Sequence, residues 1–355
     1  MQPELGLIEG FYGKPWSWQA RHDAVRDLAP YGYGFFHYAP KADAFLRRRW
    51  QELHPDEEAE ALRDLADHCR RQGVRFGIGL SPYEIYRDFD SAARQSLAAK
   101  LDQFAAIGLD DLAILFDDMR GDMPDLSQRQ IEITHWIAAR AGASRLIMCP
   151  SYYSDDPILD RVFGQRPDDY LPRLGRELDP AIHIYWTGPR VCSPDITPDH
   201  LRKVTDQLRR KPFLWDNYPV NDGPRMSPHL HLRAFTGRAA ANADLVAAHG
   251  INPASQPVLS RIPAISLNLL YAKGDAYDPQ AAFREAAMAS VGPELAGLIE
   301  ADLASLQDEG REKLPAARTD ELRARYQAID HAAAREIVDW LEGHWIITGE
   351  AVMTQ

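Results

Sequence analysis

The chain has 355 residues, of which 45% are hydrophobic and 26% are charged, and this is the composition of a soluble globular protein. Its length fits one large domain, with or without a smaller partner domain. Asp and Glu number 52 against 40 for Lys and Arg, so the formal net charge is −12. This surplus of negative charge argues against binding to nucleic acid or to anionic lipid, and we expect a neutral or cationic partner.

The cysteines and the N-terminal residues indicate a compartment. Cys69, Cys149 and Cys192 lie far apart in the sequence, so we expect neither a disulfide framework nor a CxxC metal site. The first residues lack the basic start of a signal peptide, and no apolar run reaches the roughly 18 residues that span a bilayer. We therefore expect a cytoplasmic protein with no membrane partner.

Short apolar segments alternate with amphipathic helical ones over the first three quarters of the chain. Leu62, Leu65, Ala66 and Cys69, for example, follow the i, i+3, i+4, i+7 spacing of a helix face. The apolar segments are hydrophobic at consecutive positions, as strands buried on both faces are. The alternation predicts parallel β/α units. The expected strands are 5–9, 34–38, 74–80, 112–116, 146–149, 182–186, 213–215 and 246–251.

Eight such units by about residue 275 predict an α/β fold, a (β/α)₈ TIM-like barrel, for which ~250 residues are typical. A doubly wound open sheet is the alternative, and it usually carries a glycine-rich phosphate loop after the first strand. Residues 10–13 read GFYG, which is not GxGxxG. We therefore assign residues 1–275 to a catalytic barrel.

The alternation stops after Tyr277. One helical face is expected near residues 295–306 and a longer one over 322–341, followed by a short strand-like run at 345–347. We assign residues 276–355 to a C-terminal helical domain. Its apolar faces either pack on the barrel or form a homodimer.

Polar and aromatic residues follow the expected strands. In a (β/α)₈ barrel the chemistry gathers at the C-terminal ends of the strands. Aromatic rings there can stack on sugar faces, and amide and carboxylate groups can bind hydroxyls. We therefore expect a pocket for a neutral, hydroxyl-rich ligand.

The sharpest single feature is the pair Asp117 and Asp118, directly after the fourth expected strand. Two adjacent carboxylates repel each other, which favours one ionised and one protonated group, as acid/base catalysis requires. Neighbours within a strand point to opposite faces, so both can enter one pocket only if the backbone turns just past the strand. The alternative is that one of them merely caps a short helix over 119–123.

Four segments in order resemble glycoside hydrolase family 84. They are residues 6–16 (GLIEGFYGKPW), 38–41 (YAPK), 115–118 (LFDD) and 215–222 (WDNYPVND). This family contains the β-N-acetylglucosaminidases known as O-GlcNAcases, and some members have been labelled hyaluronidases. The similarity runs through roughly residues 5 to 273. It implies a retaining exo-β-N-acetylglucosaminidase that uses the substrate's acetamide as nucleophile and forms an oxazoline intermediate, with an N-acetylglucosamine-bearing glycoconjugate or glycosylated protein as partner.

The resemblance also implies roles for individual residues. Asp117 matches the aspartate that holds the acetamido N–H, and Asp118 matches the general acid and base. The substrate-binding matches are Tyr153, Asn217, Asp222, Asn252, Gly10, Lys41, Trp215 and Tyr218, the last two as pocket floor and wall. One departure concerns position 42, where the family commonly has an acidic residue and this chain has Ala42.

The adjacency of Asp117 and Asp118 has a mechanistic consequence of its own. Ordinary retaining glycosidases place a nucleophile and an acid on opposite sides of the scissile bond, ~5–5.5 Å apart. Sequence neighbours rarely straddle a bond in this way. The pair therefore fits substrate assistance better than a covalent glycosyl-enzyme.

Other functions fit the sequence less well. The closest histidines, His229 and His231, lie outside any metal motif, and His183 stands alone, so we expect no metal and no cofactor. Glu9 is expected to fix the turn that follows it. A catalytically silent sugar-binding barrel would not need both aspartates. An endo-acting hyaluronidase would want a basic cleft, which the −12 charge disfavours.

Overall fold

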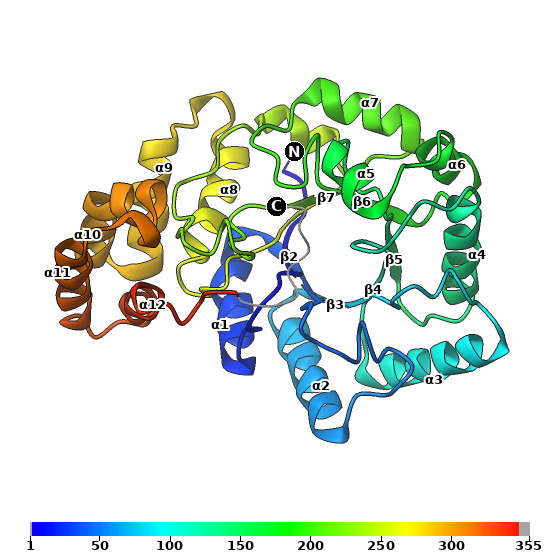
Figure 1. Cartoon of the computed structure of the whole chain (residues 1–355). Coiled ribbons are helices and arrows are strands. Elements are labelled where there is room, and N and C mark those ends of the chain that lie inside the picture. Colours follow the sequence, from blue (N-terminus) through cyan, green and yellow to red (C-terminus); the bar gives the residue numbers. More distant parts are fainter. Residues whose placement is uncertain (1, 348–355) are drawn as a thin grey trace.

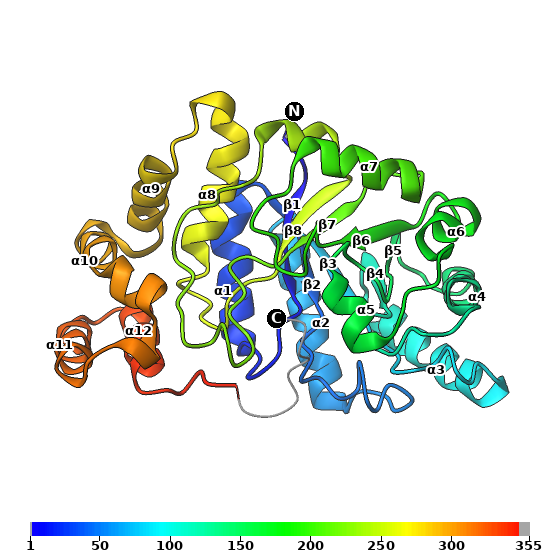
Figure 2. The ribbon, with the colours of Figure 1, turned by 45° about the horizontal axis from the view of Figure 1, so that its top comes forward.

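Eight parallel strands form a closed barrel in chain order, in a computed structural model that describes residues 2–347 (Figures 1 and 2). Each strand pairs with the next, and β8 pairs with β1. The predicted barrel is confirmed, the open sheet is excluded, and the predicted strand ends differ from the observed ones by at most two residues. The strands are β1 (Leu5–Glu9), β2 (Tyr33–Tyr38), β3 (Arg75–Leu80), β4 (Asp111–Leu115), β5 (Arg145–Cys149), β6 (His183–Trp186), β7 (Phe213–Asp216) and β8 (Ala248–Ile251).

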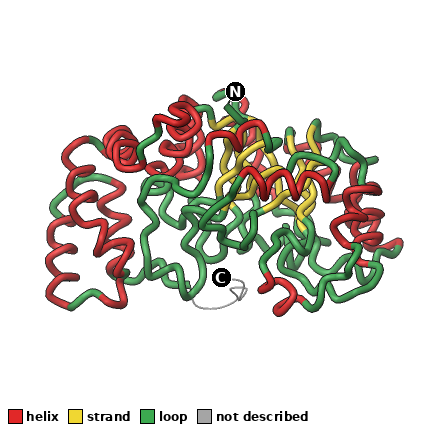
Figure 3. Tube along the Cα trace, turned by 90° about the horizontal axis from the view of Figure 1, so that it is seen from above, coloured by secondary structure: helices red, strands yellow, loops and turns green. Residues whose placement is uncertain are grey.

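Helices surround the strands, which occupy the centre of the view in Figure 3. The helix face predicted from Leu62, Leu65 and Cys69 is buried against the barrel. Side-chain caps mark several helix starts, for example Ser17, whose hydroxyl accepts the Ala20 N–H at 3.2 Å. The helices are α1 (Trp18–Leu28), α2 (Asp56–Arg71), α3 (Ser91–Ile107), α4 (Leu126–Ala138), α5 (Pro157–Phe163), α6 (Tyr170–Glu177), α7 (Pro198–Leu208) and α8 (Arg261–Lys273), with the 3₁₀ helix η1 (Ala29–Tyr31) after α1.

The seventh unit departs from the repeat. A long segment, residues 217–239, follows β7 and leads only into a short 3₁₀ helix, η2 (Ala240–Asp244). This segment contains Pro219, Pro224 and Pro228. Proline removes a backbone donor and clashes with the preceding helical turn, so an α-helix is not expected there. Two residues of this segment, Asn217 and Asp222, line the pocket at the C-terminal ends of the strands.

The C-terminal region is helical and lies beside α8, on one side of the barrel (Figure 1). The single long helix face expected over 322–341 is wrong, because the chain turns between two helices that pack on each other. The second begins after His331, whose ring nitrogen accepts the Ala333 N–H at 3.1 Å. The run 345–347 forms a turn and coil, not a strand. The elements are η3 (Gly274–Ala276), α9 (Pro279–Val291), α10 (Pro293–Leu303), the π-helix η4 (Ala304–Glu309), η5 (Arg311–Lys313), α11 (Ala316–Gln327) and α12 (Ala332–Leu341).

The apolar faces of these helices are covered within one chain. Leu322, Tyr326 and Ile337 are fully buried. These apolar faces therefore need no second subunit to cover them, and the homodimer stays a prediction. One hydrophobic cluster runs from the barrel into the helical region, so a domain boundary at 275 also stays a prediction. Residues 348–355 of the expected C-terminal domain lie outside the described part of the chain. Between residues 2 and 347, no helix has both the length and the apolar character that a membrane crossing needs.

Candidate active site

A pocket opens at the C-terminal ends of the barrel strands. Together with its open mouth it encloses about 460 Å³. Every predicted site residue except Tyr218 lines it. The lining residues are Gly10, Tyr12, Lys41, Asp117, Asp118, Cys149, Tyr153, Thr187, Val191, Trp215, Asn217, Asp222 and Asn252.

Asp117 and Asp118 enter this pocket together because the backbone turns just past β4. Asp118 has a φ of +57°, in the left-handed region. Asp visits this region more readily than most residues, because its short polar side chain can bond locally. Both residues are buried, at 6% and 8% exposure. The alternative of a capped helix over 119–123 is wrong, since no helix forms there and α4 begins at Leu126.

Two phenols hold the carboxylate of Asp118. Tyr12, in the turn after β1, donates its hydroxyl to Oδ2 at 2.8 Å, and Tyr153, after β5, donates to Oδ1 at 3.0 Å. Burial and the nearby Asp118 raise the pKa of Tyr12 and that of Tyr153 well above the usual value. Both phenols therefore remain protonated donors, and the two bonds fix the orientation of the carboxylate.

Asp117 is paired on one oxygen only. Its Oδ2 forms an ion pair with the ammonium group of Lys41, which also lies 4.0 Å from Asp118 Oδ2. Its Oδ1 is buried without a hydrogen-bond partner in the described part of the chain. A buried acceptor without a donor is costly. Oδ1 is therefore available to an N–H group of a ligand.

Amide groups line the opposite side of the pocket. Asn217 Oδ1 accepts from Trp215 Nε1 at 3.1 Å and from Asn252 Nδ2 at 3.0 Å. Asn252 Oδ1 in turn accepts the Gly10 N–H at 3.2 Å. A Cβ at Gly10 would lie 2.1 Å from the Trp215 ring, so this close approach requires glycine. Asp222 completes this side.

Asp222 links this amide side to the phenols. Its Oδ2 accepts the Tyr12 N–H at 2.7 Å. Tyr12 thus contacts Asp222 through its backbone and Asp118 through its side chain. One residue of the turn after β1 therefore orders both sides of the pocket.

Asp216, at the end of β7, anchors the amide side from below. Its carboxylate binds Arg238 through two hydrogen bonds of 2.7 and 2.8 Å, and His249 Nε2 lies 3.0 Å away. Burial alone would raise the pKa of Asp216, but Arg238 and His249 lower it to about 2. The resulting ionised network fixes the strand end from which Asn217 projects.

Tyr218 does not line the pocket. Its ring stacks on His231 at 5.8 Å and meets Phe235 edge-on at 5.0 Å, and its hydroxyl donates to the Arg233 carbonyl at 2.6 Å. Asn217 lines the pocket, whereas the ring of Tyr218 lies beyond it, packed on His231 and Phe235. The expectation that Tyr218 forms a pocket wall is not met.

Several lining residues were not singled out from the sequence. Tyr12 stands inside the GFYG segment and could have been found there, as an aromatic hydroxyl at a strand end. Thr187 and Val191 come from the loop after β6, whose path the sequence does not reveal. Cys149 ends β5, and burial raises the pKa of its thiol well above the usual value, so it remains a neutral thiol.

Glu9 lies near the pocket but is fully engaged. Its carboxylate accepts from Arg21 Nε at 2.7 Å and Nη2 at 2.9 Å, and from the Trp16 N–H at 3.1 Å. These bonds tie the turn after β1 to α1. Glu9 thus fixes the turn, as expected from the sequence.

The histidines that invited a metal interpretation have main-chain partners. His229 Nδ1 lies 2.7 Å from the Gln307 carbonyl oxygen, and His231 Nδ1 lies 2.8 Å from that of Val220. Burial lowers the pKa of His231 to about 4. Neither residue lines the pocket.

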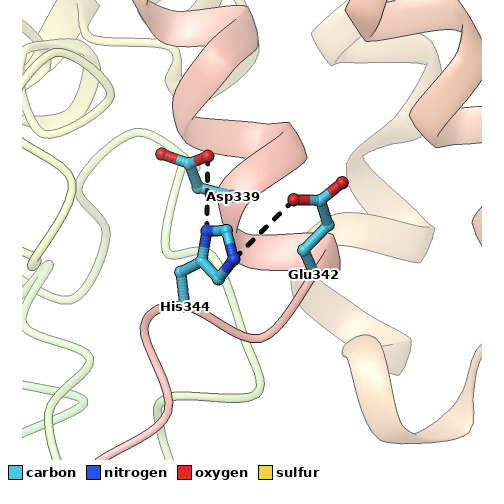
Figure 4. Close-up of side chains that lie close together, drawn as sticks. All are labelled: Asp339, Glu342 and His344. Carbon is cyan, nitrogen blue, oxygen red and sulfur yellow. Dashed lines mark ion pairs between the residues drawn. The ribbon is translucent and has the colours of Figure 1, made fainter.

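Among the described residues, the side chains of Asp339, Glu342 and His344 lie close enough together to hold a metal ion (Figure 4). The His344 ring nitrogens lie 3.5 and 3.8 Å from the two carboxylates. The group sits at the solvent-exposed end of α12 and is explained by these ion pairs.

Comparisons with known proteins show which family this chain belongs to. A family model described as beta-N-acetylglucosaminidase matches residues 5–301. The Protein O-GlcNAcases of Mus musculus and Rattus norvegicus are each 32% identical over 243 residues, covering 66% of this chain and 26% of theirs. The chain thus spans about a quarter of the length of these relatives' own chains.

A solved structure of a mutant Thermobaculum terrenum O-GlcNAc hydrolase superposes with a TM-score of 0.79 at 28% identity. The match covers 95% of this chain and 80% of that one. Together with the family model, it spans the barrel that carries the pocket. The chain belongs to the beta-N-acetylglucosaminidase family of glycoside hydrolases.

Proposed function

We propose that this protein is a retaining exo-β-N-acetylglucosaminidase that removes terminal β-linked N-acetylglucosamine by substrate-assisted catalysis. Membership of the beta-N-acetylglucosaminidase family supports N-acetylglucosamine as the sugar that is removed. The observation that carries the mechanism is the pairing of Asp117 and Asp118 in one pocket, with one acceptor of Asp117 vacant.

In the first step, Asp117 Oδ1 accepts the N–H of the substrate's acetamido group. The acetamido carbonyl oxygen then attacks the anomeric carbon while Asp118 donates its proton to the leaving oxygen. The glycosidic C–O bond breaks, and the sugar becomes a bicyclic oxazoline. Asp117 stabilises the positive charge that develops on the acetamido nitrogen.

In the second step, Asp118 acts as a base toward water. It takes a proton from the water molecule that attacks the anomeric carbon, and the oxazoline ring opens to the free sugar. Two inversions at one carbon leave the β configuration retained. Both steps need Asp118 on the side of the leaving group, and the phenols of Tyr12 and Tyr153 support that orientation.

The connection between the aspartates favours this route over a covalent glycosyl-enzyme. An enzyme nucleophile and an acid act from opposite sides of the bond. Asp117 and Asp118 are consecutive residues on one turn, and Lys41 lies within 4.0 Å of a carboxylate oxygen of each. A nucleophile supplied by the substrate removes the need to separate them.

The remaining lining residues would hold the sugar. We assign ring hydroxyls to Lys41, Asp222, Asn252 and the backbone of Gly10, and the acetamido region to Tyr153 and Asn217. The Trp215 ring would form the floor, since it is buried at 5% exposure beneath these groups. Tyr218 has no part in this assignment.

The substrate's carrier is proposed by analogy. The two mammalian relatives are named protein O-GlcNAcases. We therefore propose N-acetylglucosamine linked to a protein hydroxyl as the substrate class for this chain as well.

The direct test is turnover of an aryl β-N-acetylglucosaminide, with inhibition by a thiazoline that mimics the oxazoline. NMR of the first-formed product should show the β anomer. Absence of both turnover and thiazoline binding would support a silent sugar-binding barrel. Initial formation of the α anomer would contradict the retaining mechanism.

A further inference from the structure

Arg47 is a buried cation directly behind the turn that carries the two aspartates. It lies between β2 and α2 and is only 5% exposed. Its Nη2 donates to the main-chain oxygen of Asp118 at 3.3 Å, and its guanidinium carbon lies 5.3 Å from the centre of the Tyr83 ring. Burial of a charge is unfavourable unless opposite charge compensates it. The position therefore requires a physical reason.

Two contacts tie the segment just before Arg47 to the barrel. Leu46, the preceding residue, accepts the Ser81 N–H at 2.9 Å, which ties the loop to the end of β3. Asp43 accepts from the Tyr38 hydroxyl at 2.9 Å at the end of β2. Arg47 is thus anchored to two barrel strands before it meets Asp118.

The charges around Arg47 belong to the pocket. Burial by itself lowers the pKa of Arg47, but Tyr12, Asp118 and Asp117 together raise it above the usual value. Arg47 is therefore a permanent cation close enough to Asp117 and Asp118 to interact with their charge. With Lys41 paired to Asp117, two buried cations stand against two buried carboxylates.

The backbone of Asp118 depends on the same contact. Its φ of +57° is unfavourable for a residue with a side chain, so neighbouring contacts must hold it. The bond from Arg47 satisfies the carbonyl oxygen of this strained residue. The turn in question directs the carboxylate toward the phenols of Tyr12 and Tyr153.

We propose that Arg47 is a positioning residue for Asp118, which it holds in the left-handed turn and whose ionised form it balances with positive charge. The inference rests on the proposed function, in which Asp118 is the general acid and base. Arg47 acts through Asp118 and not on the sugar.

The test compares variants on two substrates. Arg47→Met removes the charge and the hydrogen bond but keeps the apolar stem. On a substrate with a poor leaving group, its kcat/KM should fall about 10-fold further than on an activated aryl glycoside, because only the former needs a well-placed acid. Arg49→Met is the matched control, since Arg49 is an exposed cation of the same loop that pairs with Glu52. The control should retain both activities.

The pH profile supplies a second readout. The groups that face the Asp118 carboxylate are Tyr12, Tyr153, Lys41 and Asp117, with Arg47 behind it. Removal of a nearby positive charge favours the protonated acid, so the alkaline limb of kcat/KM should move up by about one pH unit in Arg47→Met. Arg47→Lys keeps the positive charge, so it should restore the alkaline limb of kcat/KM to its original pH but recover only part of the kcat/KM value.

Two outcomes would overturn the proposal. Equal losses on both substrates with an unmoved alkaline limb would make Arg47 a general structural residue. A rise in KM alone, with kcat and the limb unchanged, would make it a leaving-group binder. Should Arg47→Met fail to fold, as judged by circular dichroism, Arg47→Gln keeps a donor without the charge and is tested in the same way.

Asp118→Ala, measured in parallel, separates this inference from the function on which it rests. If Asp118→Ala loses both substrates equally, the acid assignment is wrong. If Asp118→Ala discriminates between the substrates and Arg47→Met does not, only the role of Arg47 is wrong.

Discussion

Two Asp-Asp pairs flank β4, and they differ in how their oxygens are used. At the start of the strand, both oxygens of Asp111 are engaged, with Arg75 Nε at 2.9 Å on Oδ1 and with His37 Nε2 at 2.9 Å and Arg145 on Oδ2. Beyond its end, Asp117 is paired only through Oδ2, with Lys41, and its Oδ1 has no partner in residues 2–347.

The difference separates a carboxylate that is used up in structural contacts from one that we propose to be catalytic. Burial alone raises the pKa of Asp111, but His37, Arg145 and Arg75 hold it well below the ordinary range, so the group stays ionised and inert. A carboxylate with every acceptor satisfied can bind nothing more. Asp117 lines the pocket and its Oδ1 is buried without a partner, so a ligand that donates to this oxygen would offset the cost.

The largest effect is expected at Asp118. Asp118→Ala should lower kcat/KM by about 10²- to 10⁴-fold on substrates with poor leaving groups, because these require protonation. Activated aryl substrates should lose far less. Steady-state kinetics over a series of leaving groups measures this. Equal losses across the series would remove Asp118 as the acid.

Asp117→Asn should lower the rate on every substrate, by about 10²-fold or more, since electrostatic support of the acetamido group is needed whatever leaves. Thermal unfolding should change less than in Asp111→Asn, because Lys41, which loses its ion pair with Asp117, still lies 4.0 Å from the carboxylate of Asp118. An unchanged rate would remove Asp117 from the mechanism and would erase the contrast with Asp111.

Asp111→Asn should do the reverse. Loss of one partner from a buried ion-pair network is expected to lower the free energy of unfolding by about 3 kcal/mol. The folded fraction should keep its kcat/KM. Asp110→Asn is the control. In the unmodified chain Asp110 Oδ2 accepts the Phe76 N–H at 3.0 Å, and the amide oxygen of an asparagine can accept the same N–H. Loss of activity without loss of stability would contradict the structural role of Asp111.

Low pH should weaken the ion pairs that Asp216 makes with Arg238 and His249. The pKa of Asp216 is about 2 in the folded chain against 3.8 normally, so the unfolded chain binds the proton more readily. The stabilisation, about 2 kcal/mol, is present above pH 4 and is lost as pH falls toward 2. Urea unfolding at pH 6 and pH 3 should show about half of this loss, because the pKa of Asp216 in the folded chain lies below pH 3. Asp216→Asn should flatten this dependence, and an undiminished slope would contradict the assignment.

The smallest effect is expected at Tyr12. Tyr12→Phe removes one hydrogen bond to Asp118 but keeps the ring and the N–H bound to Asp222. A bond to a charged group contributes about 1.5–3 kcal/mol, so a loss of about 10-fold in kcat/KM is expected, larger for poor leaving groups. Unchanged kinetics would mean that Tyr153 alone orients Asp118.

The barrel could be predicted from the sequence because doubly buried strands are apolar at consecutive positions, and this pattern needs no knowledge of contacts. Residues 115–118 and 215–222 were found because strand ends and motif order are local features. The orientation of Tyr218, the burial of Arg47 and the break between α11 and α12 could not be found in this way. They depend on how distant segments pack, and the periodicity of one segment does not contain that information.

The central claim is that the substrate's acetamide is the nucleophile, supported by the vacant oxygen of Asp117. The most direct measurement is the kcat/KM of the unmodified enzyme on aryl glycosides whose N-acetyl group carries zero, one, two or three fluorines. Fluorine withdraws electrons and weakens the carbonyl oxygen as a nucleophile. The account predicts that the rate falls steeply with each fluorine added. A rate independent of fluorination would contradict it.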